Sequence, residues 1–298
     1  MSAQRCGLIA IIGRPNVGKS TLLNHILGQK ISITSRKPQT TRHRILGVET
    51  IDDDQMVFVD TPGLHRDQGK ALNRVMNKAA LGSMGDVDVI VMVVDRPEWS
   101  EEDDLIAERA LSVGVPVVLV INKIDRIDQK QSLLPAMQVI AEQRAFSAIV
   151  PVSALRSKHL DDLLREIRQY LPETVHLFPP DQITDRSERF LVAEIVREKL
   201  VRQLGEELPY ANTVQIEEFR EDRGIVHISA LIIVEKAGQK AIVIGRGGAR
   251  LKKVGEEARA DIQRLLDSKV MLKLWVKVRS GWADDERALR SLGYVEDQ

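Results

Sequence analysis

A glycine-rich loop between a predicted strand and a predicted helix constrains this chain more than any other feature. Residues 13–20 read Gly-Arg-Pro-Asn-Val-Gly-Lys-Ser, directly after the apolar run from Gly7 to Ile12 and at the start of a helical pattern. This is the order that a G-x-x-x-x-G-K-S/T phosphate-binding loop requires. The backbone amides of such a loop, together with the positive end of the helix dipole, form an anion site. The sequence therefore predicts a nucleotide-binding α/β fold.

The side chains of this loop have separate expected roles. Lys19 is expected to reach the terminal phosphates of the nucleotide, and Ser20 to ligate Mg²⁺. The loop residues that we assign to nucleotide binding are Gly13, Arg14, Pro15, Asn16, Val17, Gly18, Lys19, Ser20 and Thr21.

A second motif, Asp60-Thr61-Pro62-Gly63, follows the apolar strand predicted from Met56 to Asp60. Ligands of open α/β sheets gather at the carboxyl ends of strands, so Asp60 is expected to hold Mg²⁺ through water. Gly63 can offer its amide to the γ-phosphate, a contact whose loss on hydrolysis would release the following loop. Alone, the tetrapeptide is an ordinary turn, but beside the first motif it indicates a nucleotide switch. We include Thr61, Pro62 and Leu64 in the nucleotide site.

A third motif, Asn122-Lys123-Ile124-Asp125, closes the apolar strand predicted from Val115 to Asn122. The Asp125 carboxylate can accept hydrogen bonds from N1–H and the 2-amino group of guanine, a donor pair that adenine lacks. The presence of Asp125 therefore predicts that the chain binds GTP, and it argues against the alternative of an ATPase. Ser153 and Ala154, after the last strand, are expected to present backbone amides to the guanine oxygen.

The rhythm of strands and helices predicts the architecture of the first domain. Further strands are expected at 87–95 and 148–152, several strands are continuously apolar, and helical patterns lie between them. This indicates an α/β domain with a mostly parallel sheet and helices on both faces. A helical stripe that ends near Pro172 places the domain at residues 1–172, and a proline-containing segment at 173–187 is expected to be an extended linker.

The second half of the chain predicts a different fold. A helix at 188–204, strands at 213–219 and 225–234, two further helices and a strand at 270–278 give the order α-β-β-α-α-β. The two later helices flank Gly245-Arg246-Gly247-Gly248, a G-x-x-G turn, and residues 189–281 hold 18 basic and 13 acidic residues. Order and turn resemble an α+β KH domain of the bacterial type (type II), which binds about four unpaired bases. The candidate RNA-binding residues are Ile244, Gly245, Arg246, Gly247, Gly248, Arg250, Lys252 and Lys253.

Boundaries and composition narrow the possibilities further. The KH domain is assigned to residues 188–281 and a tail to 282–298; Trp275 is expected in the core, whereas Trp282 could equally lie in the core or stack on bases.

Cys6 is the only cysteine, so an intrachain disulfide is excluded. The amino terminus does not read as a secretory signal, and no run approaches the roughly 18 apolar residues of a membrane-spanning helix. These features favour a cytoplasmic protein.

The nucleotide motifs, in this order, resemble the translation-factor-related class of GTPases, and their pairing with a KH domain resembles the bacterial Era-like GTPases over nearly the whole chain. The resemblance assigns switch I to Gln39, Thr40, Thr41, Arg42 and His43. It implies that Thr41 closes over Mg²⁺ and the γ-phosphate, with Thr40 as the alternative. Thr41 and Gly63 are thus the candidate catalytic residues, Ser20, Thr41 and Asp60 the candidate Mg²⁺ ligands, and no general base can be named.

One residue departs from the pattern of many small GTPases. Leu64 stands where they have the glutamine that orients the attacking water. Slow intrinsic hydrolysis is therefore expected, with help from a partner, from potassium or from a rearranged loop. Arg14, Arg36 and Arg42 are unranked candidates for an internal arginine finger.

The resemblance also implies partners. It implies a factor in assembly of the small ribosomal subunit that carries GTP and binds single-stranded rRNA near the 3′ end of small-subunit rRNA. It further implies a cytoplasmic location with some peripheral association with the inner membrane; we expect mostly monomer and no DNA partner. The alternative is a peripheral-membrane signalling GTPase whose second domain binds protein, which the basic G-x-x-G cluster disfavours.

Overall fold

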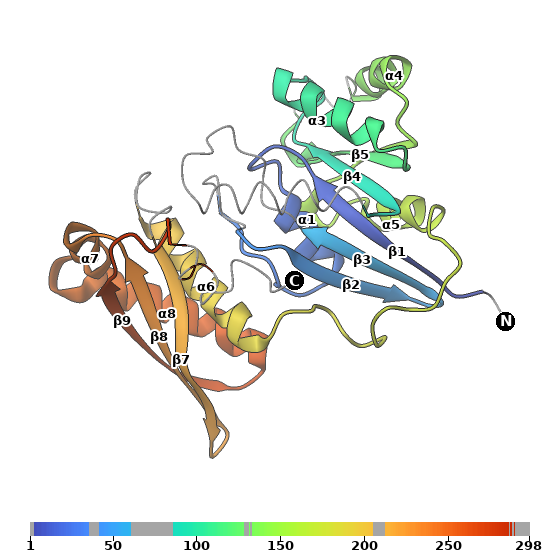
Figure 1. Cartoon of the computed structure of the whole chain (residues 1–298). Helices are drawn as coiled ribbons and strands as arrows, with labels where there is room; N and C mark the ends of the chain where they lie inside the picture. Colours follow the sequence, from blue (N-terminus) through green and yellow to red (C-terminus); the bar gives the residue numbers. More distant parts are fainter. Residues whose placement is uncertain are drawn as a thin grey trace. The chain divides into compact units, whose positions relative to one another are not determined.

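The computed structural model describes residues 3–35, 42–60, 86–127, 131, 133–204, 212–285, 287 and 289. Contacts divide this part of the chain into two compact units. The first unit holds the described residues up to 32 and from 42 to 185, and the second holds residues 33–35 and the described residues from 186 onward. Each unit has its own sheet, and the two are described separately below (Figure 1).

The sheet of the first unit has the strand order β2-β3-β1-β4-β5-β6. All neighbouring strands are parallel except β2, which pairs antiparallel with β3. Every residue of β3, β4 and β5 is buried, because a parallel sheet is covered on both faces. The strands are β1 (Arg5–Ile12), β2 (Ile45–Ile51), β3 (Asp54–Asp60), β4 (Val89–Val94), β5 (Val117–Ile121) and β6 (Ala148–Pro151).

Helices cover the two faces of this sheet. Residues of α3 and α4 join one core cluster with Ala10, Ile90 and Leu119 of the sheet. Ile9 and Val91, which point to the opposite face by strand alternation, are also fully buried; α1 packs against β3, and α5 packs against β5 and β6. The helices are α1 (Lys19–Ile26), α3 (Glu101–Ser112), α4 (Leu133–Gln143) and α5 (Leu160–Arg168), with short 3₁₀ turns η1 (Ile124–Arg126) and η3 (Ala154–Arg156).

Strand β2 was not predicted from the sequence. It contains Gly47, and glycine weakens the strand signal of a short sequence. The structure explains this glycine, because a Cβ at position 47 would lie 2.6 Å from Leu27 Cδ1 and 2.9 Å from Leu23 Cδ1. Close packing of α1 on β2 therefore requires a residue without a side chain.

Residues 173–185, which make up most of the predicted linker at 173–187, have no helix and lie along the sheet of the first unit. The backbone amide of Cys6 donates to the Pro172 oxygen at 3.1 Å, and that of Val48 donates to the Ile183 oxygen at 2.8 Å. The Gln55 side chain also donates to the Phe178 oxygen at 2.9 Å. The segment is thus tied to the first unit along its length.

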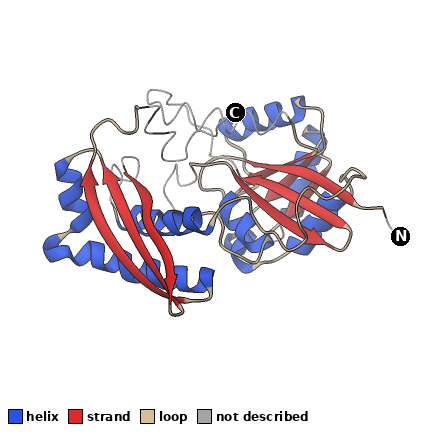
Figure 2. Ribbon diagram, turned by 60° about the horizontal axis from the view of Figure 1, so that its bottom comes forward, coloured by secondary structure: helices blue, strands red, loops and turns tan. Residues whose placement is uncertain are grey.

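The second unit is a three-stranded sheet with helices on one face (Figure 2). β8 lies in the centre, antiparallel to β7 and parallel to β9. Its elements are α6 (Glu188–Gln203), β7 (Asn212–Asp222), β8 (Ile225–Val234), α7 (Ala237–Ile244), the 3₁₀ turn η5 (Arg246–Gly248), α8 (Ala249–Leu266) and β9 (Lys269–Val278), in the predicted order α-β-β-α-α-β.

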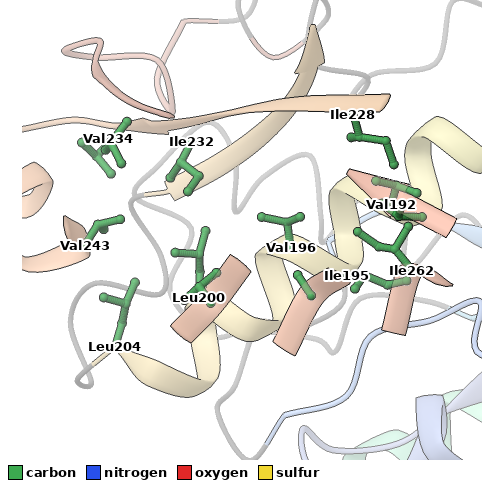
Figure 3. Close-up of a cluster of buried hydrophobic side chains, with 14 of the residues drawn as sticks. Val192, Ile195, Val196, Leu200, Leu204, Ile228, Ile232, Val234, Val243 and Ile262 are labelled. Carbon is green, nitrogen blue, oxygen red and sulfur yellow. The ribbon is translucent and has the colours of Figure 1, made fainter. Parts of the chain in front are cut away.

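One apolar core holds the second unit together (Figure 3). Side chains of α6, among them Val196 and Leu200, meet Ile232 of β8, Val243 of α7 and Ile262 of α8. All of these are 2% exposed or less. Burial of side chains of this kind contributes roughly 1.5–3 kcal/mol each, so the cluster is sufficient to fix the helices on the sheet.

Two tryptophans test the predicted core. Trp275 on β9 is 47% exposed, so its placement in the core was wrong. The outward positions of β9 alternate with the core positions, and Trp275 shares the outward face with lysines. Trp282, for which both placements had been left open, is fully buried. Within the residues that the structure describes, no helix combines the length and the apolar character needed to cross a membrane.

Candidate nucleotide and nucleic-acid sites

The glycine-rich loop connects β1 to α1, and two of its glycines are required by close approach. Gly13 has φ 140°, and a Cβ there would lie 2.3 Å from the Val93 oxygen of β4. Gly18 has φ 109° and caps α1, and a Cβ there would lie 2.3 Å from Asn122 Nδ2. Both positions therefore need glycine for space as well as for backbone conformation.

Lys19 lies inside this loop. Its ammonium donates to the backbone oxygens of Gly13 and Arg14, each at 2.8 Å. Burial lowers the pKa of Lys19 to about 8, and the nearby Asp60 partly opposes that shift. The loop thus holds a buried cation on its own carbonyl oxygens, at the place where the motif requires a group that binds phosphate.

Three side chains meet at the end of β3. The Asp60 carboxylate accepts hydrogen bonds from the hydroxyls of Ser20, at 3.0 Å, and Ser32, at 2.7 Å. Ser32 is fully buried and was not predicted. Asn24 of α1 holds it in place, because its side chain accepts from the amides of Ile31 and Ser32 and donates to the Ser32 oxygen.

This cluster fits Mg²⁺ by its chemistry. A carboxylate and hydroxyl oxygens are the hard ligands that Mg²⁺ prefers, and the ion commonly takes only one or two protein ligands beside phosphate oxygens and water. Ser20 and Asp60 would hold it. The chemistry that Mg²⁺ supplies at such a site is neutralisation of phosphate charge.

Asn122 ties three loops together. Its side-chain nitrogen donates to the Val17 backbone oxygen at 2.9 Å. Its side-chain oxygen accepts from the backbone amides of Ala154, at 3.0 Å, and Lys123, at 2.7 Å. One buried side chain, that of Asn122, therefore holds three loops together: the phosphate loop, the loop after β5 and the loop after β6.

Asp125 is exposed at the rim of these loops. Ser153, which is buried, donates its hydroxyl to the Asp125 carboxylate. That hydrogen bond is the main reason why the pKa of Asp125 is lowered. Only a backbone role was predicted for Ser153, whereas its side chain holds Asp125 ionised and oriented.

A charged network was also missed. Arg14 of the phosphate loop donates to Asp103 at 2.7 Å and to Asp95 at 3.1 Å. Asp95 in turn accepts from Lys123 at 3.0 Å, and Lys123 donates to the Asn16 oxygen at 2.7 Å. Burial alone would raise the pKa of Asp95, but the hydrogen bond and charge of Lys123 outweigh it and lower that pKa.

The network bears on two of the predicted nucleotide-binding residues. Lys123, part of the predicted guanine motif, has a side chain that is 23% exposed and donates to Asp95 and to the Asn16 oxygen. Arg14 is held by two carboxylates, which opposes its candidacy as an arginine finger. Two sequence signals could have found the acids: Asp95 directly follows a buried strand, and Ser100 with Asp103 forms a capping box at the start of α3.

Some predicted residues lie outside the described part of the chain. These are Arg36, Gln39, Thr40 and Thr41 before β2, and Thr61, Pro62, Gly63 and Leu64 after β3. Of the switch I residues that are described, Arg42 is 2% exposed and His43 is 8% exposed. Burial of Arg42 removes it from the surface, which opposes a role as an arginine finger.

In the second unit the G-x-x-G turn owes its shape to glycine. Gly245 has φ 74° and ψ 174°, a conformation restricted almost entirely to glycine, and a Cβ there would lie 2.8 Å from Arg250 Cβ. Gly247 and Gly248 are left-handed, with φ 55° and 80°, and open space surrounds both. The turn therefore brings Arg246 and Gly247 to the surface at the amino terminus of α8, while the amides of Gly245 and Gly248 donate to the oxygens of Ala241 and Gly245.

The predicted cations around this turn divide into two kinds. Arg246, Lys252 and Lys253 are exposed, and Lys253 lies 4.0 Å from Glu257. Arg250 is half-buried and donates to the Ile242 oxygen at the end of α7. Arg250, which was predicted only to bind RNA, thus also caps the carboxyl end of α7.

Two family models match the chain. One, described as a 50S ribosome-binding GTPase, matches residues 8–123, and one, described as a KH domain, matches residues 207–283. They cover the nucleotide motifs up to Lys123 and the G-x-x-G turn with its sheet.

Curated relatives extend the similarity to nearly the full length. The GTPase Era of Ectopseudomonas mendocina is 58% identical over 98% of both chains, and that of Pseudomonas aeruginosa is 58% identical over 98% of this chain and 96% of its own. The crystal structure of a variant of Aquifex aeolicus Era bound to GDP·AlF₄⁻ has TM-score 0.93 and 40% identity, covering 98% of this chain and 100% of its own.

A second structure of Era, in complex with MgGDPNP and nucleotides 1506–1542 of 16S ribosomal RNA, has the same TM-score of 0.93, 40% identity and the same coverage. Identity well above 30% over nearly the whole length, with both domain models in the same order, leaves one conclusion. This chain is a GTPase with a carboxyl-terminal KH domain and belongs to the Era family.

Proposed function

We propose that this GTPase is a switch that binds single-stranded rRNA near the 3′ end of small-subunit rRNA while it carries GTP, and that it acts in assembly of the small ribosomal subunit. The observation that supports this most is the G-x-x-G turn, where glycines with positive φ shape a turn that carries the exposed Arg246 and is followed by the exposed Lys252 and Lys253. A related structure holds RNA of that region together with a GTP analogue.

For the nucleotide we propose roles that follow from the geometry of the first unit. Lys19 and the amides of residues 13–20 bind the phosphates, Ser20 and Asp60 hold Mg²⁺, and Asp125 reads guanine through N1–H and the 2-amino group. Asn122 and Ser153 orient these groups, which the hydrogen bonds of Asn122 and Asp125 support. Thr41 and Gly63 complete the contacts to the γ-phosphate in this proposal.

Hydrolysis is proposed to be slow without help, because Leu64 cannot orient water. In this proposal a monovalent cation near the phosphates supplies the positive charge that an arginine finger supplies in other GTPases. The test compares the single-turnover rate in potassium chloride with that in sodium chloride at equal ionic strength. A higher rate in potassium supports the proposal, and equal rates remove potassium from it.

For RNA we propose that the phosphate backbone lies against the turn at residues 245–248 and that Arg246, Lys252 and Lys253 supply the electrostatic part of the affinity. The protein acts in the cytoplasm in this proposal, with peripheral contact to the inner membrane as a secondary property. Each cation that contacts a phosphate steepens the salt dependence of binding.

The experiment is an RNA pull-down from cell extract followed by sequencing, with the protein loaded either with a non-hydrolysable GTP analogue or with GDP. Enrichment of the 3′ end of small-subunit rRNA in the analogue-loaded form alone supports a nucleotide-gated assembly factor. Absence of RNA from both forms would leave a GTPase whose second domain binds protein, which is the rival function.

A further inference from the structure

The outer face of the second unit's sheet has a pattern that the G-x-x-G turn does not explain. The successive outward positions of β9 are Lys269, Met271, Lys273, Trp275 and Lys277, and all five are exposed. We call these five residues the β9 stripe. The alternate positions face the helices and belong to the core or pack against it: Val270, Leu272, Leu274, Val276 and Val278.

The β9 stripe includes two large apolar side chains that are exposed. Trp275 is 47% exposed and Met271 is 46% exposed. A tryptophan side chain can bury 150–250 Å² in a contact, and large apolar groups clustered on a surface mark interaction sites. Because β9 is the edge strand of the order β7-β8-β9, the stripe can be reached both from above the sheet and from its side.

The charge of this face is divided between the two edges of the sheet. The acidic residues Glu218 and Asp222 lie on β7, where Arg220 approaches them at 2.7 Å and 3.9 Å. The central strand β8 lies between β7 and β9 and places Ser229 opposite Lys273 and Leu231 opposite Trp275. Glu218 lies opposite Ser229 on the same face and interacts electrostatically with Lys273. The charged members of the β9 stripe are all lysines, so β9 is the cationic edge.

This combination favours a polyanion with flat apolar groups over a protein. Sequence-tolerant binding of single-stranded nucleic acid uses aromatic side chains, on which bases stack, inside a positively charged track. Cores of protein interfaces are depleted in lysine, whereas the stripe places lysines on both sides of Trp275. Its chemistry matches unpaired RNA, with phosphates on Lys273 and Lys277 and a base on the indole.

The position of the stripe fits the same ligand. α7 and α8, which the G-x-x-G turn connects, both pack against the inner face of β9. The turn and the stripe thus belong to opposite sides of one edge strand. A single RNA strand that leaves the turn can pass round this edge and reach Trp275.

We propose that the β9 stripe is a second RNA-contacting surface, which stacks an unpaired base on Trp275 and neutralises backbone phosphates with Lys273 and Lys277. The inference rests on the proposed RNA-binding function and deepens it. It predicts that the RNA footprint of the second unit exceeds the nucleotides held at residues 245–248.

Stacking is tested with the full chain loaded with a non-hydrolysable GTP analogue. The probe is a fluorescent RNA with the sequence of nucleotides 1506–1542 of 16S rRNA, the segment present in the related complex. Trp275→Leu should weaken binding about tenfold, since one stacked base contributes about 1–3 kcal/mol and tenfold is about 1.4 kcal/mol. Trp275→Phe keeps an aromatic face and should stay within about threefold of the parent. Because Trp275 is exposed, neither change should alter the fold, which circular dichroism checks.

Charge is tested by the salt dependence of the same binding reaction. The double substitution Lys273→Met and Lys277→Met should lower the slope of log K against log salt by about 1.4, because each phosphate neutralised on a single strand contributes about 0.7. Arg259→Met removes a charge from an exposed position of α8, on the helix side of the sheet, and should leave the slope unchanged.

The outcomes separate this inference from the function on which it rests. If Gly248→Asp abolishes RNA binding while the Trp275 and lysine variants bind like the parent, the stripe proposal is wrong and the proposed function stands. If the parent binds no RNA, both fail. Stripe variants that keep RNA affinity but lose association with ribosomal subunits would mean that the stripe contacts protein, which also overturns the proposal.

Discussion

The two candidate sites of this chain are built in opposite ways. In the first unit the polar groups around the nucleotide loops are buried and bonded to residues far away in the sequence: Asn122 contacts Val17 and Ala154, and Asp60 contacts Ser20 and Ser32. In the second unit the turn is shaped by its own glycines, and its cations are largely exposed. The difference follows from the ligands, because a small ligand of fixed shape needs preorganised groups, whereas a flexible polyanion is attracted by charge.

This comparison predicts different sensitivities. Loss of one buried polar group in the first unit should have a large effect on one ligand. Loss of one exposed cation in the second unit should have a small, graded effect, unless the backbone of the turn itself changes. The following substitutions probe the two units in descending order of expected effect.

Substitution of Lys19 should have the largest effect. Lys19→Ala removes the buried cation that the phosphates require, and truncation of one partner of a buried charge pair costs roughly 2–5 kcal/mol. GTP affinity should fall by at least about 100-fold, measured with a fluorescent GTP analogue. Arg109→Ala, at an exposed position of α3 in the same unit, is the control. Unchanged affinity in Lys19→Ala would refute the assignment of the phosphate loop.

The G-x-x-G turn should respond to backbone strain according to position. Gly245→Ala meets both a glycine-only conformation and a contact of 2.8 Å with Arg250, so it should destabilise the second unit by about 2–3 kcal/mol. Gly247 has a left-handed conformation with open space around it, so Gly247→Ala should lower the stability of the second unit by only about 1 kcal/mol. Hydrogen exchange of the α8 amides in the full chain measures both. Equal losses would mean that space around the turn does not matter.

The scaffold of the first unit contains a buried carboxylate whose loss should cost stability. Asp54 is 3% exposed and accepts from Arg5 at 2.6 Å and from Arg168. Asp54→Asn should lower the free energy of unfolding by about 2 kcal/mol, less than for a fully buried pair because both arginines reach solvent. Asp52→Asn, whose side chain is 80% exposed, should change little.

The same carboxylate gives a prediction for pH. Burial alone would raise the pKa of Asp54, but its bonds to Arg5 and Arg168 outweigh burial and lower it. Its contribution is therefore complete above the unfolded pKa of about 3.9 and is lost as pH falls through the lowered folded value. The stability difference between the parent and Asp54→Asn should be constant near neutral pH and shrink below about pH 4. A difference that grew on acidification would contradict the sign.

The smallest effect is expected at Asp95, which joins Arg14 to Lys123. Asp95→Asn weakens a charge-assisted link between the phosphate loop and the guanine loop, a change of about 1 kcal/mol. GDP should therefore dissociate roughly fivefold faster in stopped-flow measurements, with the thermal unfolding temperature little changed. Glu101→Gln, at an exposed position of α3, is the control. An unchanged dissociation rate would show that the loops are held without this link.

Much of the fold and part of the site could be predicted from the sequence, for reasons that the residues make clear. Lys19, Asp60 and Asn122 each follow an apolar strand within a short motif, so their neighbourhood at one end of the sheet follows from local pattern. The roles of Ser32 and Asn24 could not be predicted, because they depend on how a loop folds back onto α1.

Trp275 teaches a different limit. Trp275 was predicted to lie in the core, but in the structure it shares the exposed face of β9 with Lys273 and Lys277. Which face of a strand is buried depends on the helices packed against it, a tertiary property. The prediction failed because the alternation along the strand does not by itself say which of the two faces the helices cover.

The most direct test of nucleotide-gated RNA binding is the affinity of the full chain for the 3′-end RNA in each nucleotide state. Fluorescence anisotropy would compare the protein loaded with a non-hydrolysable GTP analogue and Mg²⁺ with the GDP form at the same salt concentration. We predict at least about fivefold tighter binding in the analogue-loaded form, the lower limit of an ordinary coupling energy of about 1–3 kcal/mol. Equal affinities in the two states would contradict the claim that GTP gates RNA binding.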